Sequence, residues 1–200
     1  MQLTPEKLQQ QNFMLLEKVE HAEFNAFMRK HSWNSSIFKV AYFMIVLLFS
    51  VMTIGLIIQS KHPIIQRILF ASLGVLIALI LIPFHEYIHY LVYKHLGATN
   101  VKITSYWSQG YVLTKADQFV VSKKEIKWIA SAPFLIISAI GIMSFFFLTD
   151  LWQISVCSMI LFHATLCYND FRILDYFLVR DSDIYMYDYV QEGVTYFYKR

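Results

Sequence analysis

The sequence predicts an all-α membrane protein, with four transmembrane helices and a small cytoplasmic β-hairpin inserted between the second and third. The first observation behind this prediction is composition: 57% of the 200 residues are hydrophobic and 16% are charged, which is too apolar for a soluble domain. The second is that the apolar residues are gathered into blocks long enough to cross a bilayer. The third is the placement of lysine and arginine, which are concentrated before the first block and between the second and third.

Four apolar blocks make up the predicted spans, because a hydrocarbon core of about 30 Å needs roughly 20 helical residues. They are Val40–Ile58, Ile68–Phe84 with a helical continuation to about Leu96, Ile129–Leu148, and Leu151–Cys167 with a continuation to about Val179. The second and fourth blocks reach the required length only when their polar ends are included. We therefore expect a transmembrane domain over residues 37–180, with its function on these two helices.

The positive charges set the expected orientation. Lys7, Lys18, Arg29 and Lys30 precede the first block, and six lysines lie between the second and third blocks, namely Lys94, Lys102, Lys115, Lys123, Lys124 and Lys127. Because loops rich in lysine and arginine stay in the cytoplasm, we expect a multi-pass protein of the cell membrane with both termini cytoplasmic. This distribution accounts for the net charge of +3, and no basic face interleaved with aromatic residues suggests nucleic acid as a partner.

The two ends of the chain are expected to lie outside the membrane. Residues 1–36 are predicted to form a cytoplasmic helical segment, because Thr4-Pro5-Glu6 supplies an N-cap, a proline at the first helical position and an acid in the first turn. This helix is expected to run toward His31. Residues 181–200 are predicted to form an acidic, tyrosine-rich cytoplasmic tail with one turn at Glu192-Gly193.

The insert between the second and third spans, residues 98–122, is predicted to contain a β-hairpin. Gly97 ends the preceding helix, and Val101–Tyr106 alternates in strand fashion. Ser108-Gln109-Gly110 supplies the turn, and Tyr111–Thr114 supplies the return strand. Ser122-Lys123-Lys124-Glu125 is a capping box that opens the third transmembrane helix.

The motif that indicates chemistry is His85-Glu86-Tyr87-Ile88-His89, at the end of the second apolar block. Residues i and i+4 share one face of a helix, so His85 and His89 can each give one imidazole nitrogen to the same zinc ion. Glu86 then lies beside the metal, where it can take a proton from water as general base. Two imidazoles and a carboxylate are expensive to bury at membrane depth, which favours a functional site over a cluster of satisfied polar groups.

A catalytic zinc usually has three protein ligands, so the motif needs a third. His95 has the spacing of the third histidine in metzincins. However, Val92 stands where that family has glycine, and without a turn there His95 points roughly 100° away from the pair. Glu125 lies near the water-facing end of the third helix, and its capping role already explains it. His95 therefore stays as an alternative ligand, and Glu125 is set aside.

Asp170 is the preferred third ligand. It follows the apolar face of the fourth span, where an isolated carboxylate is costly unless it is paired. The second and fourth spans run in the same direction. Counted from the outer end of each block, the helix reaches His85 after about 26 Å and Asp170 after about 27 Å, so the two groups lie at the same depth. The alternative for Asp170 is an ion pair with Arg172 or Lys94.

The neighbourhood of Asp170 contains further candidates. Asn169 is placed to bind a substrate carbonyl or to orient the site. His163, two turns before Asp170 on the same face, is expected to support the metal ligands from outside or to lie in the core. Cys157 and Cys167 lie within the fourth span without C-x-x-C spacing, and they are expected to be packing residues.

From the first transmembrane helix onward, the chain resembles the bacterial membrane proteins called putative zincin peptidases, which are similar to the site-2 proteases. The resemblance rests on His85-Glu86-x-x-His89 followed by Leu96-Gly97, on the strand-rich insert, on Ala132-Pro133 in the next helix, and on Asn169-Asp170 late in the last. In site-2 proteases an aspartate on a later helix completes the zinc site, which implies this role for Asp170. Phe171 stands where those proteases typically have glycine, and no PDZ-like insertion is present.

These observations predict an integral membrane zinc metalloendopeptidase that hydrolyses peptide bonds within or next to the membrane. Its expected partners are the lipid bilayer and a peptide or membrane-protein substrate, which the hairpin is placed to bind by strand addition. The alternative is a catalytically inactive zinc-binding membrane scaffold or an immunity-type partner protein. Glu86 argues against that alternative, because a structural zinc site needs no general base.

Overall fold

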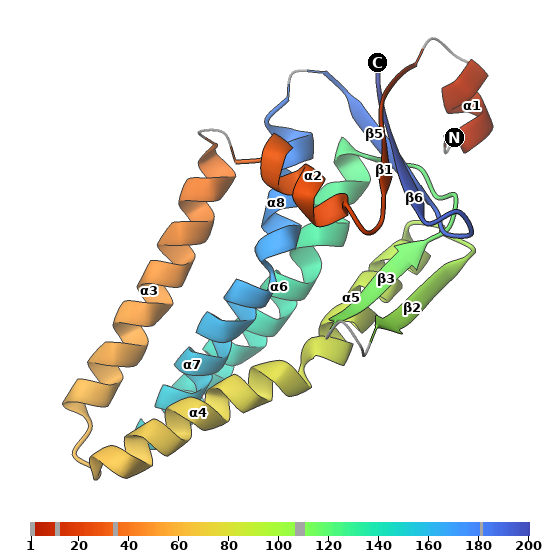
Figure 1. Cartoon of the computed structure of the whole chain (residues 1–200). Coiled ribbons are helices and arrows are strands. Elements are labelled where there is room, and N and C mark those ends of the chain that lie inside the picture. The colour runs from red at the N-terminus through yellow and green to blue at the C-terminus, as the bar shows by residue number, and fades with distance from the viewer. Residues whose placement is uncertain (1–2, 11–12, 34–35, 107–110, 181) are drawn as a thin grey trace.

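Figure 1 shows a computed structural model of the chain, which describes residues 3–10, 13–33, 36–106, 111–180 and 182–200. Long helices form a bundle, and strands gather at one end of it, where both chain termini also lie (Figure 1). The described part of the chain is mostly helical, with one two-stranded and one four-stranded antiparallel sheet.

Three helical runs are each long and apolar enough to cross a membrane. They are α3 (Ile37–Gln59), α4 and α5 together (Ile64–Ile80 and Ile82–His95), and α6 (Lys123–Phe147). Along α3, side chains that a soluble protein would bury are exposed, as a lipid-facing surface requires: Val40, Phe43, Leu47, Val51, Ile54 and Ile58. These three runs lie at the first three predicted apolar blocks.

The fourth block forms two helices, α7 (Asp150–Leu166) and α8 (Tyr168–Leu178), which are bent by 50° relative to each other. The described residues therefore contain three candidate spans, or four if this bent pair is one span. The second block is also interrupted, at Leu81, with Pro83 in the first turn of α5, where its missing N–H is tolerated. The first interruption comes just before the His85-Glu86-x-x-His89 motif, and the second comes just before Asp170.

Helices α4 and α7 pack closely because small residues line their contact. Ser155 Oγ donates a hydrogen bond to Phe70 O at 2.6 Å, and Ser158 Oγ donates to Ala71 O at 2.7 Å. A Cβ on Gly74 would lie 2.2 Å from Ser155 O, so only glycine allows this approach. Close packing of this kind, with hydrogen bonds between helices, is what holds helices together where lipid surrounds them.

The predicted hairpin is present as β2 (Val101–Tyr106) and β3 (Tyr111–Ala116), which pair in antiparallel register from Val101↔Ala116 to Tyr106↔Tyr111. Its predicted turn, Ser108-Gln109-Gly110, lies outside the described residues. The structure also confirms the two helix ends that flank the insert. Gly97 adopts a φ of 96° after α5, and Ser122 and Glu125 form the capping box of α6.

The predicted N-terminal helix running toward His31 is wrong. Helix α1 (Pro5–Gln10) begins where the capping signal indicated, but strand β1 (Met14–Glu20) follows it, and helix α2 (Phe24–His31) comes only after that strand. Strand β1 pairs with a strand near the C-terminus, from Met14↔Lys199 to Glu20↔Val194. A partner so distant in sequence leaves no local signal, so helical spacing was the only pattern visible in this segment.

The C-terminal tail is also part of the fold. Strands β5 (Ile184–Tyr189) and β6 (Val194–Lys199) form a hairpin around the predicted turn at Glu192-Gly193, where Gly193 has a φ of 67°. With β1 and the short β4 (Val121–Ser122) they form a sheet of order β1-β6-β5-β4. The prediction of helices with a hairpin insert therefore agrees with the bundle and with β2–β3, but it misses this sheet.

The sheet packs onto the ends of α6 and α8 through one apolar core. Among its most buried side chains are Met28 of α2, Ile126 of α6, Phe177 of α8 and Phe197 of β6, each at most 2% exposed. Because this core joins the bundle to the sheet, the nearby helix ends of the bundle and the sheet form one body (Figure 1). The candidate site lies near this junction.

Candidate functional site

His85 and His89 meet through the same ring nitrogen. They lie one helical turn apart on α5, and each is only 8% exposed. Their Nε2 atoms are 3.1 Å apart. Both imidazoles therefore direct this nitrogen to one point, as two ligands of a shared cation do.

Asp170 completes the group from the first turn of α8. Its Oδ2 lies 3.3 Å from His85 Nε2, and its Oδ1 lies 3.6 Å from His89 Nε2. A tetrahedral zinc with ligand bonds of about 2.0–2.1 Å keeps its donor atoms about 3.3–3.4 Å apart. Separations of 3.1, 3.3 and 3.6 Å fit a single zinc ion in this donor set. The acid thus lies at the level of the histidines, as the comparison of helix depths predicts.

The outer nitrogen of His89 is held by a backbone carbonyl that a proline leaves free. His89 Nδ1 donates to Ile129 O at 2.8 Å. In a regular helix this carbonyl would accept the N–H four residues later, but that residue is Pro133, which has none. Donation from Nδ1 places the proton there and leaves a lone pair on Nε2, which is the atom that faces Asp170.

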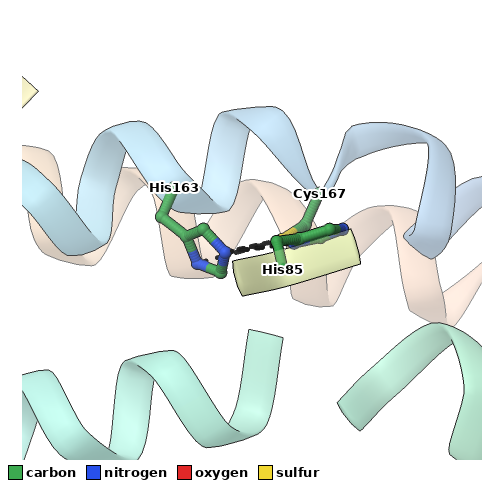
Figure 2. A group of neighbouring side chains, drawn as sticks. All are labelled: His85, His163 and Cys167. Atoms are coloured by element: carbon green, nitrogen blue, oxygen red, sulfur yellow. Dashed lines mark hydrogen bonds between the residues drawn. The ribbon is translucent and has the colours of Figure 1, made fainter. Parts of the chain in front are cut away.

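The outer nitrogen of His85 faces a second group of donors. Figure 2 shows His163 of α7 and Cys167, at the α7–α8 joint, gathered around His85. His163 Nε2 lies 3.2 Å from His85 Nδ1, and Cys167 Sγ lies 3.8 Å from the same nitrogen. All three side chains are buried, and they form a possible second metal-ligating set that shares His85 with the first.

His163 thus contacts a candidate ligand from outside, as the sequence predicts. The expectation that Cys167 only fills space is incomplete, because its sulfur lies 3.7 Å from His163 Nε2 and beside His85. The available signal was the spacing of four between His163 and Cys167, which puts both on the face that also leads to Asp170. Cys157 is buried on α7 and belongs to neither donor group of the described residues.

Glu86 is buried beside these donors with an unused acceptor. The side chain is 7% exposed, and its Oε2 has no hydrogen-bond partner among the residues that the structure describes. Its backbone carbonyl accepts a hydrogen bond from Thr114 Oγ1 of β3 at 2.9 Å, which ties the hairpin to α5. A buried carboxylate oxygen without a partner is costly, and next to a set of zinc donors it can serve a reacting water.

The remaining candidates lie away from the donor group. His95 is exposed at the end of α5, so it is not brought to the pair, and Asn169 is exposed on α8. Glu125 accepts from Ser122 N at 2.9 Å in the capping box. The two cations considered as partners of Asp170 are engaged elsewhere: Arg172 donates to Ser32 Oγ at 3.0 Å, and Lys94 donates to Thr99 O at 2.7 Å.

A cavity of about 160 Å³ opens beside the donor group. His89 and Asp170 line it on the side of the bundle, and Lys115 of the hairpin and Asp188 of the sheet also line it. Much of its wall is apolar, from Leu113, Ile126, Ile129, Ile173 and Met186. The donor group is therefore reached through a pocket enclosed jointly by the bundle, the hairpin and the sheet.

Comparisons with known proteins agree with this geometry. No curated protein and no solved structure matches the chain. A family model described as putative zincin peptidase matches residues 78–185, more than half of the chain. The matched range contains His85, Glu86, His89, the β2–β3 hairpin and Asp170. The chain accordingly belongs to the putative zincin peptidase family.

Proposed function

We propose that this protein is an integral membrane zinc metallopeptidase that hydrolyses peptide bonds within or next to the membrane. The observation that carries the proposal is the donor set of His85, His89 and Asp170, whose spacings fit one zinc ion, beside the unpartnered Oε2 of Glu86. A purely structural zinc site is closed by a fourth protein ligand and needs no such carboxylate. Membership of a zincin family and the apolar helices support the same conclusion.

The zinc donors and Glu86 have different proposed roles in the reaction. His85, His89 and Asp170 would hold the zinc, which supplies a Lewis acid that lowers the pKa of water and polarises the scissile carbonyl. Glu86 accepts the proton of the attacking water and then donates it to the leaving amine. The bond from His89 to Ile129 O and the contact from His85 to His163 keep both imidazoles oriented for this task.

The hairpin is the proposed guide for the substrate. A peptide must be extended to expose its scissile bond, and β3 pairs with β2 along only one of its edges in the described residues. Leu113, Thr114 and Lys115 of β3 line the cavity that contains His89 and Asp170. An extended substrate that adds to the free edge of β3 would therefore pass beside the donor group.

The test of this function combines a measurement of zinc content with a variant of the proposed general base, Glu86. Purified protein should hold one zinc per chain, which His85→Ala or His89→Ala removes and Asp170→Ala weakens. Glu86→Gln has nearly the same shape and should keep the zinc, but the loss of a general base should lower peptidase activity about 10²–10⁴-fold. Zinc is measured by elemental analysis, and activity by the accumulation of membrane-protein fragments in cells.

His95→Ala is the matched control, since it removes an exposed histidine from the end of the same helix and should change neither quantity. If His95→Ala removes the zinc while Asp170→Ala does not, the assignment of Asp170 as the third zinc ligand is wrong. If Glu86→Gln holds zinc and fragment accumulation is undiminished, the protein is a zinc-binding scaffold and not a peptidase.

A further inference from the structure

Lys115 is a buried cation in the wall of the cavity beside the donor group. It is 8% exposed, and it lines the same cavity as His89 and Asp170. In the described part of the chain its ammonium makes neither a hydrogen bond nor an ion pair, whereas buried charges in proteins are normally paired. The position therefore calls for an anion that the chain itself does not provide.

The acid that acts electrostatically on Lys115 within the described chain, Asp188, has other partners. Its Oδ1 accepts a hydrogen bond from Thr195 Oγ1 at 2.6 Å and lies 3.4 Å from His21 Nε2. Asp188 acts on Lys115 only at longer range: burial lowers the pKa of Lys115, and Asp188 opposes that effect without cancelling it. The ammonium thus has no ion pair with a carboxylate of the described chain, although it lines the cavity.

The stability of the hairpin does not account for this lysine. Its partner directly across the hairpin is Lys102, and like charges placed opposite each other on neighbouring strands are destabilising. Lys102 is exposed and can turn into water, whereas Lys115 is held inside. Lys115 therefore costs the folded chain stability, which is typical of a residue kept for binding.

We propose that Lys115 forms a carboxylate-binding subsite of the cavity, so that the preferred substrate presents a carboxylate near its scissile bond. This inference rests on the proposed function, because the scissile bond is placed by the zinc donors. Ile126, Ile129 and Ile173 line the same cavity, which favours apolar residues in the segment that it binds. The carboxylate is either the C-terminus of the substrate or an aspartate or glutamate side chain.

The test uses probes that do not depend on knowing the substrate. Alkyl hydroxamates bind zinc at one end, and a series of chain lengths would end in either a carboxylate or a carboxamide. Their dissociation constants are measured by calorimetry on the zinc-loaded full chain in detergent at pH 7. At the best length, wild type should bind the carboxylate at least about tenfold more tightly than the carboxamide, as expected for one charge-assisted pair.

Lys115→Met keeps a side chain of similar length and should abolish this preference while leaving binding of the carboxamide unchanged. Lys102→Met is the matched control, because it removes an exposed lysine of the same hairpin and should keep the preference. Two peptidyl hydroxamates then identify the source of the carboxylate. One has a free C-terminus and no acidic side chain, and the other has an amidated C-terminus and one aspartate.

The outcomes separate the two proposals. If the protein holds zinc and binds both hydroxamate series equally at every chain length, with no effect of Lys115→Met, the carboxylate subsite is overturned and the zinc site stands. If the protein holds no zinc and binds neither series, the proposed peptidase function fails and the subsite fails with it.

Discussion

Each histidine of the donor group uses its two ring nitrogens for different tasks. Nε2 of His85 and of His89 faces Asp170, while Nδ1 faces a group on another helix, Ile129 O or His163 Nε2. For His89 the outer contact decides which nitrogen bears the proton, because a carbonyl only accepts, and so it prepares the inner lone pair before any metal arrives. Asp170 is orientated by the pair of histidines in the same way, with one oxygen toward each ring.

At the residue scale, Lys115 should make the protein less stable at neutral pH than a neutral variant. Burial lowers its pKa in the folded state below the unfolded value of 10.5, so the unfolded chain binds more protons between these two pKa values. Wild-type stability should therefore rise with pH through that window. Lys115→Met should raise the melting temperature at pH 7, and this gain should shrink as the pH approaches 10.5.

Thermal unfolding of the metal-free protein in detergent, followed at several pH values, measures this effect. Lys102→Met serves as the control, since an exposed charge should change stability by no more than about 0.5 kcal/mol. An equal gain for Lys102→Met, or a gain for Lys115→Met that persists unchanged at pH 10.5, would show that the charge of Lys115 is not desolvated.

At the scale of elements, the breaks in regular helices create the site. The α4–α5 and α7–α8 interruptions come directly before the donors, and the proline within α6 frees the carbonyl that holds His89. A continuous helix satisfies its own carbonyls and leaves none for a side chain. The proline in α6 thus supplies the hydrogen-bond acceptor that His89 uses.

Pro133→Ala should separate metal binding from stability. Alanine restores an N–H that competes with His89 Nδ1 for Ile129 O, so zinc affinity should fall about 10–100-fold, as for loss of an outer partner of a metal ligand. The metal-free protein should be no less stable, because proline within a helix is unfavourable by about 3 kcal/mol. Competition with a zinc chelator measures the affinity.

The control for this variant is Ser131→Ala, which alters a half-buried side chain of the same helical turn. It should leave the zinc affinity unchanged. Unchanged affinity in Pro133→Ala as well would mean that the hydrogen bond to Ile129 O does not orient His89.

The contact between α4 and α7 should depend on the glycine at position 74. A methyl group there would meet Ser155 O at 2.2 Å and Met159 N at 2.9 Å, so Gly74→Ala should cost about 1–3 kcal/mol as the helices move apart. Gly55→Ala is the matched control on α3, where an added Cβ meets nothing within 4 Å. Gly55→Ala should be neutral or slightly stabilising, because alanine favours a helix over glycine. Melting temperatures in detergent compare the two, and equal effects would contradict the close packing at Gly74.

At the scale of the whole molecule, the N-terminal and C-terminal segments build the sheet side of the site. β1 pairs with β6, and Asp188 and Thr195 of the C-terminal hairpin line the cavity beside the donor group. At the opposite end of the bundle, His62 lies 3.1 Å from Asp150, so the α3–α4 and α6–α7 connections are adjacent there. The bundle therefore has one end with the sheet and one with short connections (Figure 1).

We expect the sheet end to face the cytoplasm, since most of the positive charge lies there. Lys61→Cys, at the end with short connections, should react with a membrane-impermeant maleimide in intact cells, and Glu192→Cys, in the turn between β5 and β6, should react only after permeabilisation. Both native cysteines are buried and should contribute little background. Ready labelling of Glu192→Cys in intact cells would reverse the orientation.

The sequence by itself determined the features that depend on local spacing. Apolar blocks located the helices that are long and apolar enough to cross a membrane. The i, i+4 spacing of His85 and His89 indicated two donors on one face, and counting residues along the second and fourth blocks brought Asp170 to the level of the histidines. Capping residues at Ser122 and Glu125 and the glycine at position 97 also placed helix ends correctly. These are properties of short segments, and short segments carry their own signal.

Only the tertiary structure decided the features that depend on contacts between distant segments. Strand β1 is held by β6 from the other end of the chain, so its residues alone favoured a helix. The burial of Lys115, the contact of Cys167 with His85, and the capture of His89 by Ile129 O each require helices and strands to be packed first. Desolvation and hydrogen-bond partnership are set by the surroundings of a group, and in this protein those surroundings come from segments that are distant from one another in the sequence.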